Sequence, residues 1–194
     1  MIKTIKYLIE DFKIFRFVHP NKILFNIFYL PSFRIVLLFR LSQLFYKSII
    51  LIPLAYLLTI LNDTLNGVWI GPKVEVGKGF YLGHPRGLVV NPNVKIGNYC
   101  SIIQQVTLGG PRTEIGDYVS LNAGAKVISD PLKSEIVKVG NNSIVAAGAI
   151  VLSSFEESSV LAGIPAKCVK RLANDENWVT MRRKINKNKF HSAS

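Results

Sequence analysis

One histidine stands in a setting that suits proton transfer. His84 lies in a short segment that reads Gly-His-Pro-Arg-Gly over residues 83–87. An imidazole titrates near neutral pH, so a histidine at an accessible turn can take a proton from a hydroxyl group as a general base. Asn91 follows closely and is a candidate to orient that imidazole or to bind the substrate. Gly109 and Gly110 are candidates to present backbone N–H groups to an oxyanion, because glycine lets the backbone approach closely.

Each of these residues also has a purely structural interpretation. His84 taken alone could be a solvated loop residue, and two successive glycines could only turn a corner. Asn91 could likewise be a corner residue, because Asn tolerates the left-handed backbone conformation. His19 and His191 are interpreted as ordinary surface residues.

The elements that must position these residues follow from a six-residue repeat. Aliphatic residues recur at this spacing from about residue 68 to residue 152, and the next residue is often glycine. The repeating positions are Ile70, Val76 and Leu82; Val90, Ile96, Ile102 and Leu108; Ile115, Leu121 and Val127; and Val139, Val145 and Val151. A period this short excludes a helix face and indicates a parallel β-helix, whose coils bury their apolar faces against one another.

Two interruptions of the repeat mark candidate functional faces. Leu82 and Val90 are eight positions apart instead of six, and the segment between them contains His84. The second interruption lies between Val127 and Val139 and predicts either a degenerate coil or a projecting loop. Insertions in repeat proteins tend to gather on the functional face, so both segments are candidates for substrate contact.

Positive charge is concentrated at the two ends of the chain. The formal net charge is +12, and residues 1–47 and 167–194 each carry eight basic and two acidic side chains. The residues between them carry eight of each sign. A neutral barrel with cationic ends favours an anionic partner, such as a phospholipid surface or a phosphate-bearing cofactor. Nucleic acid is not the expected partner, because no groove-reading motif accompanies the charge.

The two cysteines indicate a reducing compartment. Cys100 occupies an interior position of the repeat and Cys168 lies in a basic segment, so they do not form a disulfide framework. Lys and Glu interrupt the apolar residues at the start of the chain, so no cleavable signal peptide is expected. We therefore expect a cytoplasmic protein.

Three regions are expected along the chain. Residues 1–66 form a helical, basic and apolar region for oligomer or membrane contact, residues 67–166 form the β-helix, and residues 167–194 form a basic tail. The apolar stretch over residues 33–61 has three open interpretations. It could pack in an oligomer core, lie on a membrane surface, or span a membrane.

Several segments together resemble one known family. They are Leu82-Gly83-His84 followed by Gly87-Leu88-Val89-Val90, SIIQQVTLGG over residues 101–110, LNAGAKV over residues 121–127, VAAGAIV over residues 145–151, and AGIPAK over residues 162–167. With the preceding helical segment, residues 31–171 resemble the hexapeptide-repeat acyltransferases. The resemblance is strongest to the serine acetyltransferases and their relatives in surface-polysaccharide synthesis. It implies a mainly β fold, a left-handed parallel β-helix with N-terminal α-helices and a short C-terminal helical tail.

The resemblance also implies partners and residue roles. Three barrels associate as a homotrimer, and acyl-coenzyme A lies in the groove between two subunits, with His84 as the general base. Thr107, Ala123 and Ala147 would line the path of the pantetheine arm, where small side chains and the family both suggest acetyl-CoA as the donor. Lys167 and Lys170 would meet the nucleotide phosphates, although they could also be ordinary tail charges. No metal site is predicted.

Departures from the serine acetyltransferase pattern bear on the acceptor. Gly83 stands where that family carries Asp before the histidine, and Trp69 stands where it carries another Asp. The segment over residues 111–114 is also shorter and lacks a second histidine. These differences argue against serine and favour a sugar hydroxyl. Trp69 and Tyr81 would then stack on the sugar ring and Arg86 would contact it, although Trp69 could instead cap the first coil.

The sequence thus predicts an acetyl-CoA-dependent O-acetyltransferase that acts by direct transfer, with His84 as the base. The expected acceptor is a saccharide. The acetyl group would be transferred to a sugar hydroxyl of a capsular polysaccharide or exopolysaccharide, or of the precursor of such a polysaccharide. The cationic N-terminal region is expected to make peripheral contact with the anionic inner membrane surface. Two alternatives remain open, a serine O-acetyltransferase and a non-catalytic trimeric scaffold.

Overall fold

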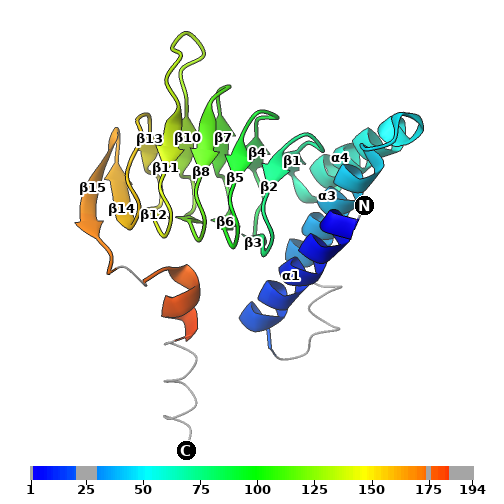
Figure 1. The fold of residues 1–194 in the computed structure, drawn as a ribbon, viewed down its shortest axis with the longest axis horizontal. Helices are drawn as coiled ribbons and strands as arrows, with labels where there is room; N and C mark the ends of the chain where they lie inside the picture. Colours follow the sequence, from blue (N-terminus) through cyan, green and yellow to red (C-terminus); the bar gives the residue numbers. More distant parts are fainter. Residues whose placement is uncertain (1, 21–29, 174–175, 184–194) are drawn as a thin grey trace, which may run out of the picture.

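A row of parallel coils with helices at one end makes up the molecule (Figure 1). The structure is a computed structural model that describes residues 2–20, 30–173 and 176–183. His191 and the predicted tail beyond residue 183 lie outside the described residues. The helical elements are α1 (Ile2–Val18), α3 (Pro31–Phe45), the 3-10 helix η1 (Ile49–Leu51) and α4 (Ile52–Asn66). Residues 178–183 form a short helix near the C-terminal end.

The strands follow α4 in successive coils. They are β1 (Val68–Ile70), β2 (Glu75–Val76), β3 (Tyr81–Gly83), β4 (Leu88–Val90), β5 (Lys95–Ile96), β6 (Ser101–Ile103), β7 (Thr107–Gly109), β8 (Thr113–Ile115), β9 (Ser120–Leu121), β10 (Lys126–Ile128), β11 (Val137–Val139), β12 (Ile144–Val145), β13 (Ile150–Val151), β14 (Ser159–Gly163) and β15 (Ala166–Arg171).

Every third strand joins the same sheet, which is the signature of a three-sided solenoid. Sheet A has the order β1-β4-β7-β10-β13, sheet B has β11-β8-β5-β2, and sheet C has β15-β14-β12-β9-β6-β3. All neighbours pair in parallel except β14 and β15, which pair antiparallel. The predicted fold is therefore confirmed: a left-handed parallel β-helix preceded by α-helices and followed by a short helix.

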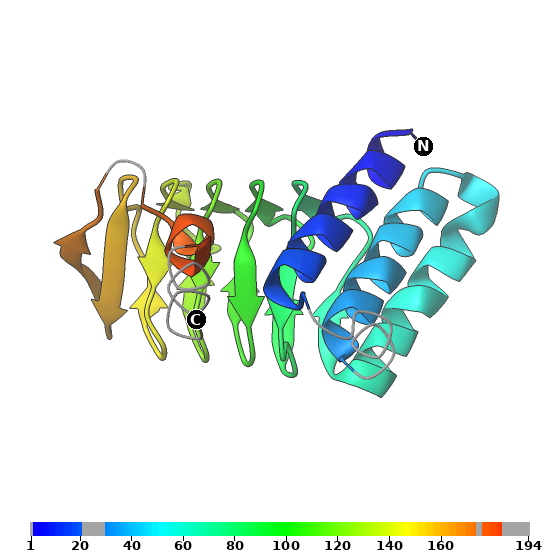
Figure 2. The same cartoon turned by 90° about the horizontal axis from the view of Figure 1, so that it is seen from below.

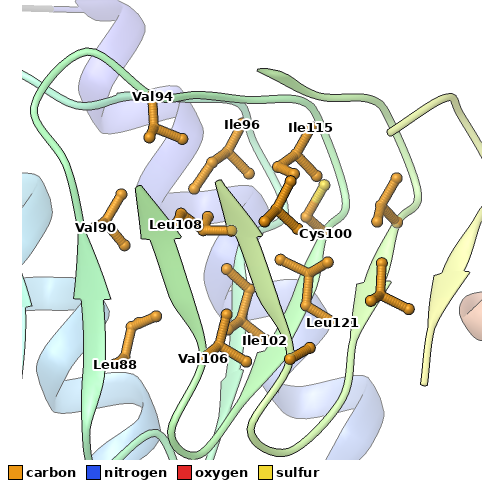
Figure 3. Packing of buried hydrophobic residues seen from close by; sticks show 14 of the residues in the cluster. Leu88, Val90, Val94, Ile96, Cys100, Ile102, Val106, Leu108, Ile115 and Leu121 are labelled. Carbon is orange, nitrogen blue, oxygen red and sulfur yellow. The ribbon is translucent and has the colours of Figure 1, made fainter. Parts of the chain in front are cut away.

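The repeating aliphatic residues form the interior of the β-helix. Parallel register places Ile102 against Leu121 and Val90 against Leu108, and all four side chains are fully buried. Figure 3 shows these side chains stacked coil upon coil. Each coil thus buries its apolar residues only against the coils beside it, as expected for a solenoid.

The second interruption of the repeat is a projecting loop. Residues 129–136 leave the barrel between β10 and β11 and extend away from it at the top of Figure 1. Leu132 in this loop is 94% exposed. Sheet A continues from β10 to β13, so the loop interrupts the chain without interrupting the stack of coils.

A buried ion pair fastens the helices to the first coil. Arg40 Nε of α3 donates to Asp11 Oδ2 of α1 at 2.8 Å, and both side chains are almost fully buried. Asp11 Oδ1 also accepts from the backbone N–H of Phe80 at 2.7 Å. Arg40 donates further to the carbonyl oxygens of Val76 and Gly77. The carboxylate and the guanidinium together fix the direction in which α1 runs across the β-helix.

Candidate active site

His84 lies at an exposed corner of the first coil. It directly follows β3 and precedes β4, so it stands where sheet C turns into sheet A. Its side chain is exposed and its φ angle is +50°, a left-handed conformation that is uncommon for residues other than glycine. The His84 carbonyl oxygen accepts a hydrogen bond from the N–H of Arg86 at 2.9 Å. Gln105 and four other described non-glycine residues at corners have φ angles of 54° to 59°, so this conformation is how the β-helix turns its corners.

The same corner continues along the β-helix, first with Gln104 and Gln105 and then with small residues on the two following coils. Backbone hydrogen bonds link Gln105 N to Arg86 O, Gly124 N to Gln104 O and Gly148 N to Ala123 O. Ala123 and Ala147, two predicted contacts of the donor, therefore lie on the corner that carries His84. A Cβ built on Gly148 would meet no atom within 4 Å. The corner is thus uncovered at Gly148.

The outer face of sheet C next to His84 is covered by two helical segments. Tyr81 of β3 stacks on Trp178 of the short helix, with ring centroids 5.9 Å apart and planes at 26°. The Trp178 indole N–H donates to the carbonyl oxygen of Tyr99 at 2.7 Å. The Tyr81 hydroxyl also shares a 3.1 Å hydrogen bond with Nε2 of His19, which lies just after α1.

The packing around Tyr81 explains why a glycine precedes His84. A Cβ at Gly83 would lie 2.9 Å from Cγ2 of Ile103 and 3.3 Å from Cε1 of Tyr81. The Tyr81 hydroxyl would be 3.6 Å away. The space that a larger side chain would need beside His84 is therefore filled by Tyr81 and Ile103.

The covered face holds neutral groups beside a positive charge. Burial lowers the pKa of His19, and the positive charge of Arg182 and the nearby His84 lower it further. Burial raises the pKa of Tyr81, and Arg182 opposes that rise. At neutral pH we therefore expect an uncharged His19 imidazole and a protonated Tyr81 hydroxyl, with Arg182 as the cation.

Three other predicted residues lie at a different corner of the same chain. Asn91 follows β4, and Gly109 and Gly110 lie at the end of β7, where sheet A turns toward sheet B. Residues 85–87 and the three residues of β4 lie between His84 and Asn91, and β4 alone spans roughly 10 Å at a rise of about 3.3 Å per residue. One chain therefore does not bring these residues to His84, and a catalytic role for them needs a neighbouring copy.

Local structure already accounts for these corner residues. Asn91 Oδ1 accepts a hydrogen bond from the N–H of Asn93 at 3.0 Å, an arrangement typical of a turn. Gly110 has a φ angle of +80°, and a Cβ there would lie 2.1 Å from the carbonyl oxygen of Ser129. Only glycine fits at position 110.

The remaining predicted contacts are spread over the outer surface. Trp69 (45% exposed) and Thr107 lie on the outer face of sheet A, and Arg86 lies at the corner beside His84. Lys167 and Lys170 are exposed on β15, at the end of the β-helix away from α1. Within the described ranges, no group of three or more His, Cys, Asp or Glu side chains is placed to hold a metal ion.

His19, Trp178 and Arg182 are the residues near His84 that sequence reasoning missed. His19 was interpreted as a surface residue, yet it is partly buried and bonded to a tyrosine 62 positions away. Trp178 and Arg182 lie beyond the repeat, in a segment interpreted only as a basic tail. No local spacing links these residues to His84, so only the fold reveals that they lie close together.

Comparison with known proteins clarifies the chemistry. No protein-family model matches the chain. The chain is 31% identical to the serine acetyltransferase of Synechococcus elongatus over 149 residues, which is 73% of this chain and 58% of that protein. The structure matches Neisseria gonorrhoeae serine acetyltransferase in complex with serine with a TM-score of 0.76 and 28% identity, covering 87% of this chain and 70% of that one. It matches Brucella abortus serine acetyltransferase in complex with coenzyme A equally well, at 0.76 and 28%, covering 87% and 68%.

These matches support the hexapeptide-repeat acyltransferase family. Within it, the relatives are serine acetyltransferases, and the surface-polysaccharide branch that the sequence suggested is not confirmed. The prediction of a saccharide acceptor is contradicted by the same comparisons. The structure adds a physical reason, because Tyr81, which was expected to stack on a sugar ring, stacks on Trp178. This chain spans 58% of the length of the cyanobacterial relative.

Proposed function

We propose that this chain is an acetyl-CoA-dependent serine O-acetyltransferase with His84 as its general base. The observation that carries the proposal is the position of His84, exposed at the open corner of a β-helix similar to that of serine acetyltransferases. The small side chains of Ala123 and Ala147, further along the corner that carries His84, suit the extended pantetheine arm of acetyl-CoA. Lys167 and Lys170 remain candidates to meet the nucleotide phosphates.

The proposed reaction is a direct transfer between two bound substrates. Nε2 or Nδ1 of His84 takes the proton from the serine hydroxyl as its oxygen attacks the thioester carbonyl carbon. The tetrahedral oxyanion then collapses, the carbon–sulfur bond breaks, and the protonated imidazole returns its proton to the coenzyme A thiolate. The products are O-acetylserine and coenzyme A, and no covalent enzyme intermediate forms.

Thiol release from acetyl-CoA with L-serine as acceptor tests this proposal. General-base catalysis contributes roughly 100- to 10,000-fold, so His84→Ala should reduce kcat by about that factor. Asp63→Ala, an exposed residue of α4, is the control and should keep wild-type activity. Serine-independent thiol release, or equal rates for wild type and His84→Ala, would refute the assignment. Failure to bind coenzyme A would favour the non-catalytic scaffold.

A homotrimer is part of the same proposal. Asn91, Gly109 and Gly110 are separated from His84 by the width of sheet A within one chain, so their predicted roles need a neighbouring subunit. Light scattering coupled to size-exclusion chromatography should give three times the mass of 21.7 kDa. A monomer that is fully active would remove these residues from the proposed site.

Peripheral membrane contact remains a separate proposal. Residues 49–66 are long and apolar enough to cross a membrane, and only 22% of them are buried. Ile49 and Ile50 are more than 80% exposed and follow the exposed Lys47, an arrangement that suits an anionic lipid surface. The full chain should sediment with anionic liposomes at low salt, and it should stay in solution with zwitterionic ones. Sedimentation with neither would end this proposal.

A further inference from the structure

An open groove of about 750 Å³ lies between the helices and the outer face of sheet B. Sheet B is the side of the solenoid opposite the corner of His84, where sheets C and A meet. One wall of the groove comes from the N-terminal end of α1 and the C-terminal end of α3, and the other comes from sheet B. The mechanism above uses none of the residues at its helical end, which include Lys3, Thr4, Tyr7, Gln43, Tyr46, Lys47 and Lys73.

The helical end of this groove carries unbalanced positive charge. Lys3, Lys47 and Lys73 are exposed, and none of them forms an ion pair with a carboxylate of the described residues. Lys3 Nζ lies 5.4 Å from the centroid of the Tyr7 ring. Lys73 Nζ lies 6.0 Å from the centroid of the Tyr46 ring. This end of the groove therefore offers three cationic donors and two aromatic rings to a ligand.

The other end of the groove is electrically balanced. The outward side chains of sheet B alternate in sign from one coil to the next, in the order Glu75, Lys95, Glu114 and Lys138. Lys95 and Glu114 form an ion pair at 3.2 Å. Positive charge is therefore in excess at the helical end, and an anionic ligand is expected to bind there.

Exposed apolar side chains adjoin the helical end of the groove. Figure 2 shows the N-terminal end of α1 and the turn between α3 and α4 at the same end of the helical layer. Ile2 is 71% exposed, and Ile49 and Ile50 of η1 are 83% and 84% exposed. Tyr46 connects the groove to this apolar surface, because its ring packs edge-on against that of Tyr56 in α4, with centroids 6.1 Å apart.

Helix α4 packs with its small and polar residues inward. Ala55, Thr59, Asn62 and Asn66 are buried. Asn62 donates to the carbonyl oxygen of Ile35 in α3 at 3.1 Å. The exposed residues of α4 are mostly apolar and include Leu54, Tyr56, Leu57 and Ile60. A helix on a water-exposed surface has the reverse arrangement, whereas helices that contact lipid pack through small and polar residues. The outward face of α4 therefore suits an apolar environment.

A bilayer with anionic headgroups matches both parts of this surface. Lysine binds phosphate as a point charge, and tyrosine rings are enriched at the level of the headgroups. A second copy of the chain fits less well, because a twofold contact through this face would place lysines against lysines. Residues 2–9 and 46–62 contain Lys3, Lys6 and Lys47 and no acidic residue.

We propose that the helical end of the groove binds the phosphodiester headgroup of an anionic phospholipid. Lys3, Lys47 and Lys73 contact the phosphate, while η1 and the outward face of α4 contact the apolar layer. This inference rests on the proposed membrane contact and deepens it, because it names the lipid and the residues that recognise it. It does not depend on the acceptor of the acetyl group.

Vesicle sedimentation with two matched pairs of lysine variants tests the headgroup site. Lys47→Gln combined with Lys73→Gln removes two of the three proposed contacts. Lys95→Gln combined with Lys138→Gln removes the same charge from the balanced end of the same groove. Each lysine at an anionic surface contributes about fivefold to binding, so the first pair should weaken binding to phosphatidylglycerol vesicles roughly 25-fold. The second pair should stay within about threefold of wild type in about 0.1 M salt, which screens charges more than about 10 Å away.

Ile49→Ser combined with Ile50→Ser tests the apolar part of the surface. Both side chains are exposed in the protein, and their transfer into lipid should account for at least about tenfold in vesicle binding. Leu132→Ser is the control, because Leu132 is 94% exposed on the projecting loop, and it should bind as the wild type does. Light scattering should give the isoleucine double variant the wild-type mass. A smaller mass would show that this face joins copies of the chain, which would overturn the lipid assignment.

The remaining outcomes separate the headgroup site from the membrane contact on which it rests. If the wild type sediments with phosphatidylglycerol vesicles and both lysine pairs lose binding equally, the membrane contact stands and the headgroup site is overturned. If the wild type does not sediment, both are overturned. Soluble glycerol 1-phosphate should not displace the protein from vesicles, and displacement would identify a free phosphate ester as the ligand instead of a lipid. Each variant should keep the wild-type Tm, which shows that it is folded.

Discussion

Replacing Asp11 by alanine tests how α1 is fixed to the β-helix. The Asp11 carboxylate is almost fully buried and accepts from Arg40 Nε at 2.8 Å and from the N–H of Phe80 at 2.7 Å. Asp11→Ala leaves the buried guanidinium without a counter-charge and the Phe80 N–H without its acceptor. Loss of one partner from a buried ion pair costs about 3–5 kcal/mol. For a chain of this length, that predicts a fall in Tm of roughly 6–20 °C.

The assay is thermal and urea unfolding at one fixed protein concentration, because association changes apparent stability. Glu156→Ala is the matched control. It breaks the exposed pair between Glu156 and Arg171, which is worth at most about 1 kcal/mol. The double variant Asp11→Leu with Arg40→Met should recover part of the loss, because it removes both buried charges but leaves the Phe80 N–H without an acceptor. If Asp11→Ala loses no more stability than Glu156→Ala, the ion pair does not fix α1.

Three further predictions concern single residues. A thiol reagent at pH 8 should react with Cys168 alone in the native protein and with both cysteines after unfolding. The reason is that burial raises the pKa of Cys100 to about 12, whereas Cys168 is exposed. Fast reaction of two thiols in the native protein would contradict this prediction. The pKa of His19 is lowered in the folded protein, so the unfolded chain protonates this imidazole more readily than the folded protein does. The contribution of His19 to the free energy of unfolding is therefore present above about pH 6.5 and is lost as the pH falls. The difference in unfolding free energy between wild type and His19→Asn should therefore shrink between pH 7.5 and 5.5, and a constant difference would count against a buried neutral imidazole. Gly110→Ala should destabilise the fold by at least about 1–2 kcal/mol, because it adds a Cβ to a left-handed residue that touches Ser129; urea unfolding measures this, and an unchanged midpoint would show that the corner can rearrange.

The fold could be predicted because it depends on contacts between residues that are close in the sequence. A residue such as Leu82 or Ile102 needs only its sequence spacing to be assigned to the interior, since each coil packs against the next one along the chain. The exposed position of His84 follows from the same rule, because the repeat breaks there. The β-helix and its proposed base are therefore visible without any coordinates.

The acceptor was predicted wrongly because missing acidic residues were given too much weight. Gly83 and Trp69, each in place of an acidic residue, were interpreted as evidence against serine. In the structure, Tyr81 and Ile103 fill the space beside Gly83, so the glycine is a packing requirement. The sequence does not show that Tyr81 points toward Gly83, because that contact depends on how the outer face of sheet C is covered.

The sequence by itself determined the solenoid, its apolar interior and the exposed corner of His84, because these depend on contacts between adjacent coils. The tertiary structure alone decided what lies next to that corner. His19, Tyr81 and Arg182 come from three segments that no period connects, and the buried pair of Asp11 with Arg40 sets where the first of them lies. Such contacts form between distant segments whose positions follow only from the packing of the whole chain.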